Sequence, residues 1–363
     1  MTSHNYGVIM AGGAGPSFWP LSREGRPMQF LNAVKGKSFL RTTYERYLEL
    51  VPRENIFIVT LSRYRDLVFD DIPDLPAGNL ILEPYGRNTA PCIAYATYTI
   101  LKRDPEAVMV VGPADNLVPV HEAWKRTLNE ALNYADNHEA LITLGIVPDK
   151  PDTNFGYIQV AGGAKAYEQE KPVKIKTFTE KPDEDLARVF VESGEFLWNS
   201  GIFVWKASVI RQELEHHIPA VTDLFRNWEQ FIGTSEEQHF IERAYMNMDR
   251  ISIDYAVMEK TAKGWVYPAD FQWASVGNWE SAYHHIGNPD SDGNATYGGR
   301  HLLMDCKDDI IVTTDKGKLI AISGLEDYMV IDNRNVLMIC PRDDKRIKDI
   351  TSHIGLPYYE DYR

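Results

Sequence analysis

Short apolar runs alternate with amphipathic stretches over the first 150 residues of this chain. Each run is long enough for a buried strand, and each stretch between them places its apolar side chains on one helical stripe. The first stretch follows Ser38, whose hydroxyl is suited to cap a helix. Strands are expected at 6–10, 56–60, 80–83, 108–111 and 141–144, and helices at 39–51, 90–102 and 122–133. This alternation predicts an α/β fold with a mainly parallel, Rossmann-like sheet and helices on both faces.

The stretch from about 150 to 285 is less regular, and we interpret it as insertions within the same domain. Helices are expected near 183–192, 207–216 and 252–260. Ligands of a parallel sheet bind outside the carboxyl ends of its strands. The loops that follow the strands are therefore where binding residues are expected.

A sharp rise in polarity at residues 288–294 predicts a linker. Beyond it, short strands are expected at 310–312, 319–322, 328–331 and 336–339. Their close, even spacing predicts a small all-β unit, which a charged helix at 342–353 closes. We therefore expect one domain at 1–287 and a β unit with its closing helix at 288–363.

Composition agrees with a soluble globular protein, since 44% of the 363 residues are hydrophobic and 25% are charged. There is no apolar run of the roughly eighteen residues that a membrane span needs, so no membrane partner is expected. The formal net charge of −14 argues against a nucleic-acid partner but allows one mononucleotide. Cys92, Cys306 and Cys340 are far apart in sequence, which indicates free thiols and a cytoplasmic protein.

A glycine-rich loop follows the first expected strand and is the first candidate for chemistry. Gly12, Gly13 and Gly15 allow the backbone to approach a bulky anion, because no Cβ atoms intervene. Such a loop usually brings cations for phosphates. Here Ser17 and Met28 stand at two positions where a phosphate-handling enzyme would use Arg or Lys.

A glycine-rich turn after a strand also occurs in dinucleotide-binding folds, in P-loops and in purely structural turns. A dinucleotide fingerprint runs directly into a helix, whereas Pro16 and Pro20 interrupt this segment. No Gly-Lys-Ser/Thr follows, so the loop is not a P-loop. The loop alone leaves the ligand open.

The full set of motifs resembles the signature of sugar-1-phosphate nucleotidyltransferases, and within them mannose-1-phosphate guanylyltransferases. The similarity runs over almost the whole chain. The matching segments are 11–15, 18–23, 27–30, 83–91, 154–158, 178–182, 198–201 and 252–260. The closing β unit resembles the short left-handed β-helix that such enzymes often carry and that contributes to dimers, so a homodimer is expected.

The resemblance implies that the protein converts GTP and mannose 1-phosphate to GDP-mannose and pyrophosphate. The sugar phosphate attacks the α-phosphorus of GTP, and pyrophosphate leaves in line. Such chemistry depends on positioning and charge stabilisation. It implies Mg²⁺ held by one or two carboxylates.

The resemblance also implies site residues by position. The nucleotide side comprises Ala11, Gly12, Gly13, Gly15, Glu83, Asn88, Ala90 and Asp115. The sugar side comprises Gly156, Glu180, Lys181 and Asn199. Catalysis is expected from Arg23, Asp115 and Lys181, with Asp115 as the metal ligand. An amide can read a guanine edge, a carboxylate accepts sugar hydroxyls, and an ammonium group holds a phosphate.

The departures from the family pattern gather on the phosphate side. The family has Arg where this chain has Ser17, Lys where it has Met28, and a metal-binding Asp where it has Ser275. Its Ser-Asp-His is Ala-Asp-Asn at residues 114–116. One charge-assisted hydrogen bond contributes about 1.5–3 kcal/mol, so each loss implies a rate lower by roughly ten- to a hundredfold.

Three functions therefore remain open. The first is a working guanylyltransferase with weakened catalysis. The second is a catalytically impaired paralogue that binds nucleotide sugars or regulates. The third, a glycosyltransferase of related fold, suits the glycine-rich loop less well.

Overall fold

The computed structural model describes residues 4–13, 15–31, 36–118, 121–163, 171–269, 271–275, 279, 289–342 and 344–362. They form two compact units, each built from segments that are distant in sequence. The larger unit comprises Met1–Gly12, Thr43–Ala114 and Val118–Trp273. The smaller unit comprises Gly13–Thr42, Asp115–Leu117 and Ala274–Arg363. The expected domain boundary after residue 287 lies outside the described residues.

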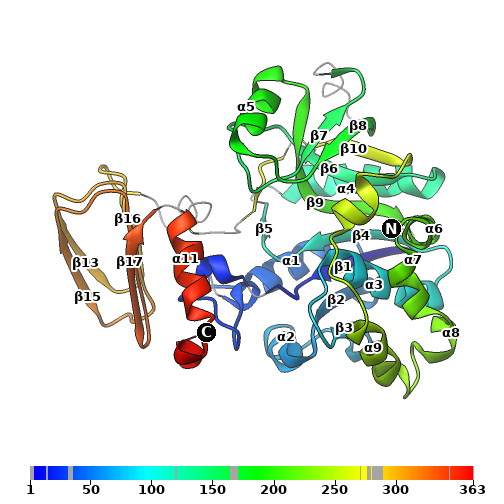
Figure 1. Ribbon diagram of the computed structural model, residues 1–363, viewed down its shortest axis with the longest axis horizontal. Helices are drawn as coiled ribbons and strands as arrows, with labels where there is room; N and C mark the ends of the chain where they lie inside the picture. Colours follow the sequence, from blue (N-terminus) through cyan, green and yellow to red (C-terminus); the bar gives the residue numbers. More distant parts are fainter. Residues whose placement is uncertain are drawn as a thin grey trace. The chain divides into compact units, whose positions relative to one another are not determined.

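A nine-stranded sheet forms the larger unit, in the order β3-β2-β1-β4-β9-β6-β10-β8-β7 (Figure 1). The strands are β1 (Asn5–Met10), β2 (Ile56–Leu61), β3 (Leu80–Glu83), β4 (Val108–Pro113), β6 (Leu141–Ile146), β7 (Tyr157–Val160), β8 (Val173–Thr179), β9 (Phe196–Lys206) and β10 (Gly264–Pro268). Strands β8 and β9 run against the rest. The prediction of a mainly parallel sheet is confirmed, because β3, β2, β1 and β4 form one parallel block and β6 pairs parallel with β10.

The helices connect these strands. They are α1 (Phe39–Tyr47), α2 (Arg65–Asp71), α3 (Thr89–Arg103), α4 (His121–Asn137), α5 (Glu184–Ser193), α6 (Ala207–His217), α7 (Pro219–Thr222), α8 (Trp228–Phe231) and α9 (Glu237–Met246). The expected cap of the first helix is present, because the Arg41 backbone N–H donates to the Ser38 hydroxyl over 2.8 Å.

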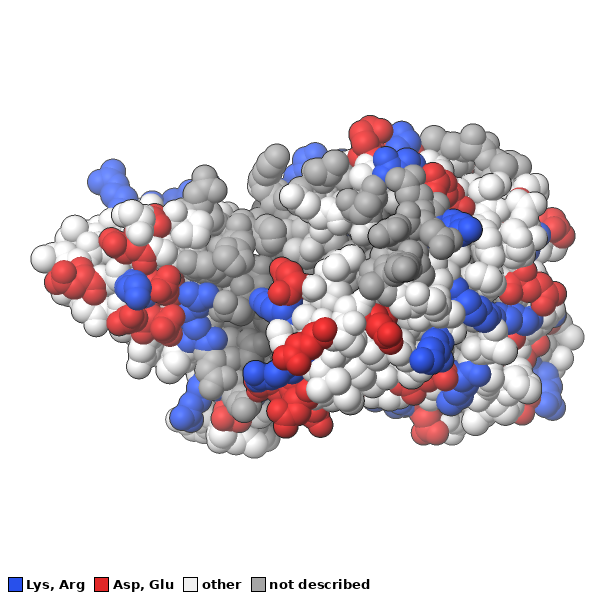
Figure 2. All heavy atoms as spheres, turned by 90° about the horizontal axis from the view of Figure 1, so that it is seen from above, with Lys and Arg blue, Asp and Glu red and all other residues white. Residues whose placement is uncertain are grey.

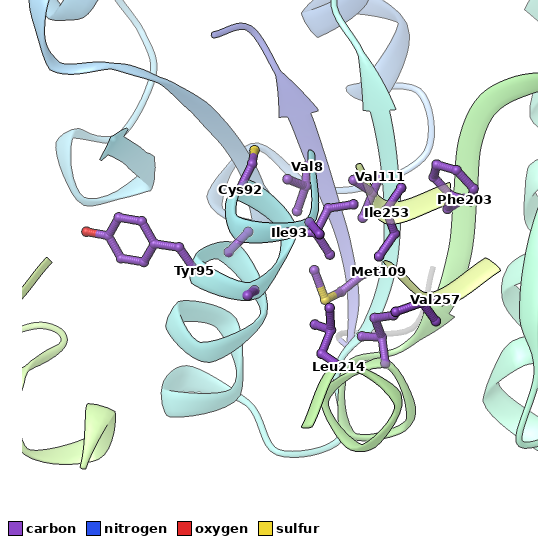
Figure 3. Packing of buried hydrophobic residues seen from close by; sticks show 14 of the residues in the cluster. Val8, Cys92, Ile93, Tyr95, Met109, Val111, Phe203, Leu214, Ile253 and Val257 are labelled. Carbon is purple, nitrogen blue, oxygen red and sulfur yellow. The ribbon is translucent and has the colours of Figure 1, made fainter. Parts of the chain in front are cut away.

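Helices cover both faces of the sheet, as the sequence pattern predicts. Met109 and Val111 of β4 belong to one apolar cluster with side chains of α3 and α6, where Figure 3 shows Ile93 and Leu214. The alternate residues of a strand point to the other face. There Tyr47 of α1 fills the space over Gly112, since a Cβ at Gly112 would lie 2.7 Å from the Tyr47 hydroxyl oxygen.

The middle of the chain is more regular than its sequence pattern indicates. The interpretation of insertions is corrected by β7, β8, β9 and β10, which complete the sheet. The Asn-Ser-Gly of residues 199–201 lies inside β9 at an irregular point, where Asn199 pairs with Gly145, Gly201 has φ 72° and the Gly201 N–H donates to the Asn199 side chain. Helices α5 and α6 confirm two expectations. The helix expected over 252–260 is instead a single π-helical turn, Asp254–Met258.

The smaller unit contains the expected all-β coil. Its strands are β5 (Asn116–Leu117), β11 (Ala274–Ser275), β12 (Ala295–Tyr297), β13 (Arg300–Met304), β14 (Ile310–Thr313), β15 (Leu319–Ser323), β16 (Tyr328–Asn333) and β17 (Val336–Pro341). Parallel rungs stack β12 on β14 on β16, and β13 on β15, as in a β-helix (orange in Figure 1). The expected closing helix is α11 (Asp344–Ile354).

The glycine-rich loop segment belongs to the core of this smaller unit. Phe18, Trp19 and Met28 are buried in one cluster with apolar side chains of the β coil and of α11. The Trp19 indole N–H donates to the Tyr362 carbonyl over 2.8 Å. The Asn333 side chain donates to the Pro20 carbonyl over 2.6 Å. The C-terminal β coil therefore holds the segment that follows Gly13.

Surface and length features agree with the composition. None of the helices in the described ranges is both long and apolar enough to cross a bilayer. On the face in Figure 2, basic and acidic side chains are intermingled rather than gathered into a basic surface.

We expect Asn333→Ala to lower the free energy of unfolding by about 1–3 kcal/mol, because it removes the shorter of two hydrogen bonds to the buried Pro20 carbonyl and the acceptor of the Thr314 hydroxyl. Urea denaturation followed by tryptophan fluorescence measures this change. Asn335→Ala is the matched control, since Asn335 is exposed and accepts only a surface hydrogen bond from Arg23. Equal losses in the two variants would contradict the anchoring role of Asn333.

Candidate active site

The carboxyl ends of the parallel strands bring part of the expected nucleotide side together. Ala11 leaves β1 with its N–H bonded to the Val59 carbonyl, and its own carbonyl accepts from the Thr60 hydroxyl, both over 2.8 Å. Gly12 follows beside the end of β3. A Cβ at Gly12 would lie 3.3 Å from Oε2 of Glu83, so glycine allows the loop to pass this carboxyl. The expected neighbours Ala11, Gly12 and Glu83 therefore share one edge of the sheet.

Glu83 itself is buried, with a relative exposure of 4%. Its Oε1 accepts a hydrogen bond from the Tyr245 hydroxyl over 3.0 Å. Burial raises the pKa of Glu83 to about 8, although the bond from Tyr245 acts in the opposite direction. Sequence reasoning missed Tyr245, which lies on α9 outside every motif. Glu83 is therefore a buried, hydrogen-bonded side chain next to the backbone of Gly12.

The segment around Asn88 is fixed from two sides. Asn88 has φ 71°, and its Oδ1 accepts from the Thr89 N–H, which caps α3. The Ala90 N–H donates to the Ile251 carbonyl over 3.1 Å. The Thr89 hydroxyl accepts from the Ile253 N–H over 2.8 Å. Asn88 is exposed at the start of α3, and these hydrogen bonds hold the backbone beside it.

The expected sugar residues of the larger unit do come together. A Cβ at Gly156 would lie 2.6 Å from Oε2 of Glu180 and 3.5 Å from Cβ of Asn199. Lys181 Nζ lies 3.6 Å from Oε1 of Glu180. Glycine at 156 is therefore required for the Glu180 carboxylate to occupy its position. The result is one carboxylate, one ammonium group and one amide around an open stretch of backbone.

Asn199 leads to a residue that sequence reasoning missed. Its Nδ2 donates to Oδ1 of Asp254 over 3.0 Å, and its Oδ1 accepts from the Thr143 hydroxyl over 2.8 Å. Asp254 lies in the matched segment 252–260, which is the signal that could have identified it. A π-helical turn carries it, and such turns are frequent at functional sites.

The two carboxyl groups of this side influence each other. Burial, together with the charge of Asp254, raises the pKa of Glu180 to about 7, although Lys181 acts in the opposite direction. Burial also raises the pKa of Asp254 to about 6, against bonds from its backbone and the charge of Lys181. Both groups are thus poised to exchange protons near neutral pH, which is typical of functional sites.

The smaller unit carries the rest of the expected phosphate side. Gly15 has φ 57°, and a Cβ there would lie 2.6 Å from Cγ of Met28. Met28 is only 5% exposed and packs in the core. Gln29 Nε2 donates to the Gly13 carbonyl over 3.0 Å. Ser17 lies in a 3₁₀ turn, Pro16–Phe18. The position expected to carry a lysine is therefore occupied by an apolar side chain that supports the loop.

Arg23 is directed into its own unit. Its Nε donates to the Pro20 carbonyl over 3.2 Å, and its Nη2 donates to Oδ1 of Asn335 over 3.1 Å. Burial and the nearby charge of Arg334 lower the pKa of Arg23. Its expected catalytic role stays a prediction.

Asp115 follows the end of β4, where Thr43 donates from its hydroxyl to the Ala114 carbonyl over 2.9 Å. Burial raises the pKa of Asp115 to about 6. In the smaller unit β5 pairs antiparallel with β11, which sets Ser275 opposite Asn116. Ser275 therefore stands beside the Asp115 turn with a hydroxyl where the resemblance implies a carboxylate. Among the residues that the structure describes, no three His, Cys, Asp or Glu side chains gather as a metal site.

Comparisons with known proteins match this arrangement. The nucleotidyl transferase family model matches residues 6–288, and the MannoseP isomerase/GMP-like beta-helix domain model matches residues 299–352. A mannose-1-phosphate guanylyltransferase of Escherichia coli K12 is 34% identical, over 93% of this chain and 70% of its own length. The xanthan biosynthesis protein XanB of Xanthomonas campestris pv. campestris B100 is 33% identical, over 96% of this chain and 72% of its own.

A solved structure extends the similarity to three dimensions. The crystal structure of mannose-1-phosphate geranyltransferase from Thermus thermophilus has a TM-score of 0.85 at 28% sequence identity. The match covers 97% of this chain and 100% of that chain. The fold is therefore shared over nearly all of this chain and the whole of that one.

We expect Glu83→Gln to remove a pH dependence of stability. The folded state holds the Glu83 proton to about pH 8, against 4.5 for an ordinary glutamate, so it binds more protons than the unfolded state between these values. Stability due to this group is present at low pH and is lost as pH rises through about 8. From pH 6 to 9 the wild type should therefore lose about 2–3 kcal/mol more than Glu83→Gln in urea denaturation.

Tyr245→Phe tests the same assignment from its partner. Loss of the hydroxyl removes the bond that lowers the pKa of Glu83, so the loss of stability should continue to a higher pH than in the wild type. Identical pH profiles for the wild type and Glu83→Gln would show that Glu83 keeps an ordinary pKa.

Proposed function

The chain belongs to the nucleotidyl transferase family, and we propose that it makes GDP-mannose and pyrophosphate from GTP and mannose 1-phosphate. The observation that carries this proposal is the carboxylate of Glu180 held over Gly156 with Lys181 beside it. A carboxylate that accepts hydroxyl hydrogen bonds beside an ammonium group suits a sugar that carries a phosphate. The relatives named above support mannose as the sugar and guanosine as the nucleoside.

In the proposed reaction the enzyme supplies position and charge. An oxygen of the sugar phosphate attacks the α-phosphorus of GTP, a new P–O bond forms, and the bond to the leaving pyrophosphate breaks. Lys181 orients the attacking phosphate, and Glu180 fixes the sugar ring through its hydroxyls. The backbone of Ala11, Gly12, Gly13 and Gly15 receives the triphosphate.

The base side rests on a segment with a rigid backbone. Asn88 can donate to and accept from the edge of guanine, and the bonds around Thr89 and Ala90 hold its backbone in place. On the same side, the buried carboxyl of Glu83 lies next to the backbone of Gly12. We keep Asn88 as the base-reading residue of this proposal.

Asp115 suits a magnesium ion that takes most of its ligands from the phosphates of the substrate. Burial holds the carboxyl in a partly dehydrated position at the end of β4, where an ion would favour its charged form. Mg²⁺ is commonly bound by one or two carboxylates together with substrate phosphates and water. When bound there, Mg²⁺ would neutralise charge on the triphosphate. Ser275 would contribute at most a neutral oxygen.

A nucleotide-sugar-binding or regulatory role is the second candidate. The observation that favours it is the burial of Met28, which leaves this position of the loop without a cation. Catalysis weakened at Ser17, Met28 and Ser275 is the intermediate case. The assay below separates these outcomes.

We further propose a cytoplasmic homodimer with a nucleotidyltransferase domain at 1–287 and a β unit at 288–363. All three cysteines are free and buried, which suits a reducing compartment. The β coil exposes large apolar side chains, which suit an interface between copies. They are Leu302, Met304, Leu319, Leu337 and Ile339.

The deciding experiment follows pyrophosphate release from GTP, mannose 1-phosphate and Mg²⁺, with glucose 1-phosphate as the epimeric control. Turnover with mannose 1-phosphate supports the enzyme. Binding of GDP-mannose by calorimetry without turnover would favour the second candidate.

We expect Lys181→Ala to raise the KM for mannose 1-phosphate by about 10–100-fold, the equivalent of one charge-assisted hydrogen bond. The KM for GTP should change by less than about twofold, because the proposed contact is to the sugar phosphate. Lys176→Ala is the control, since Lys176 is an exposed lysine of the preceding strand. A parallel rise of both KM values would remove Lys181 from the sugar side.

Ser275→Asp should lower the Mg²⁺ concentration for half-maximal rate, because it adds a carboxylate opposite Asn116, beside the Asp115 turn. Ser275→Asn has nearly the same size without the charge and serves as the control. An unchanged Mg²⁺ dependence in Ser275→Asp would show that this position does not face the metal.

A further inference from the structure

The side chain of Asn199, expected to bind sugar, has little capacity left for it. Its Oδ1 accepts from the Thr143 hydroxyl over 2.8 Å and from the Gly201 N–H over 3.2 Å. An amide oxygen has two lone pairs, and both are used here. The Gly201 N–H can only donate, so the orientation of the amide is fixed. Its NH₂ group must therefore point to Asp254.

One carboxylate oxygen of Asp254 accepts the hydrogen bond from the Asn199 amide. The bond from Asn199 Nδ2 reaches Oδ1 over 3.0 Å. An ionised carboxylate has about four acceptor positions, so most of its capacity is not used by Asn199. The backbone of Asp254 also bonds to the carboxyl, and within the described ranges Asn199 is the one side chain that is hydrogen-bonded to it. The group is therefore held in place with acceptor capacity to spare.

The surroundings of Asp254 are those of the sugar side. The charge of Lys181 lowers the pKa of Asp254, and the negative charge of Glu259 raises it. Asp254 in turn raises the pKa of Glu180. The charge of Lys181 thus acts on two carboxyl groups from different elements. Burial disfavours both charges, which costs stability unless hydroxyl donors arrive.

We propose that Asp254 accepts a hydroxyl of the sugar substrate, and that Asn199 acts through Asp254 as a positioning residue. This inference rests on the proposed function and names a specificity residue of the same site. Glu180 and Asp254 then read two different hydroxyls of a hexose 1-phosphate while Lys181 holds its phosphate. Two fixed acceptors select among epimers, because a misplaced hydroxyl leaves a buried carboxylate unpaired.

The positioning path runs across three elements. Thr143 on β6 orients Asn199 on β9, and Asn199 holds Asp254 on the π-helical turn. A purely structural role would instead have Asn199 and Asp254 stabilise the turn without touching the sugar. The two alternatives differ in how paired substitutions combine.

The test measures the Kd of mannose 1-phosphate by calorimetry for the wild type, Asp254→Asn, Asn199→Ala and the double variant. Each single variant should weaken binding by about 10–100-fold, and the double variant should be no weaker than Asp254→Asn alone. The affinity for GTP should be unchanged. Additive losses would mean that Asn199 contacts the sugar itself, and that would overturn the positioning role.

Two controls exclude trivial causes. Glu259→Gln removes a nearby negative charge from an exposed residue and should change the Kd by less than about twofold. Thermal melting should remain within a few degrees of the wild type in Asp254→Asn. A variant that binds sugar normally, or that loses sugar and GTP together through unfolding, would overturn the proposal.

Monodeoxy analogues of mannose 1-phosphate identify the hydroxyl. For one analogue the wild type and Asp254→Asn should bind equally, since the partner of Asp254 is already missing. An equal penalty from Asp254→Asn for every analogue would overturn the contact. If the wild type binds mannose 1-phosphate without releasing pyrophosphate, the proposed reaction fails while these Kd values still decide the role of Asp254. If it binds no sugar phosphate, both proposals fail.

Discussion

The pairing of β9 is the constraint on which the larger unit depends. This strand runs against its neighbours and joins β4, in the parallel block, to β6 and β7. Its second half is anchored in the core by Phe203 and Trp205. Its first half carries Asn199 to the sugar side. A shift of register lies between Thr143 and Gly145, beside the point where the Thr143 hydroxyl meets Asn199. Such irregularities redirect side chains, so the register shift helps to direct Asn199 toward the proposed sugar side.

The smaller unit shows a different dependence. The loop that follows Gly13 is ordered by apolar packing with the β coil, not by its own hydrogen bonds alone. Met28 lies at the centre of this arrangement, between Gly15 and the core. An apolar side chain there strengthens the packing and brings no charge to a phosphate. At this position, apolar packing of the loop and a cation for a phosphate are therefore alternatives.

The sequence predicts the first half of the fold well, because its strands are continuous apolar runs and its helices have clear caps such as Ser38. It fails for β9, since Asn199, Ser200 and Gly201 carry the composition of a turn. Long-range pairing of its two ends, 196–198 with β7 and 203–206 with β4, makes β9 one strand around this irregular middle. The site divides in the same way. Residues inside motifs, such as Gly156 and Glu180, do meet, whereas Tyr245 lies on a helix with no local signal at all.

The two proposed sides of the site affect the stability of the fold in opposite ways. Glu180 and Asp254 are carboxyl groups whose pKa values burial raises, so the empty protein is less stable for holding them charged. A fold gains nothing from such a pair unless a ligand supplies hydroxyl donors. On the loop, by contrast, the costly charge is absent and Met28 contributes packing instead. The chain therefore maintains destabilising groups on the proposed sugar side and stabilising ones on the proposed phosphate side. Substrate selection, more than rate acceleration, is what this arrangement of charges favours.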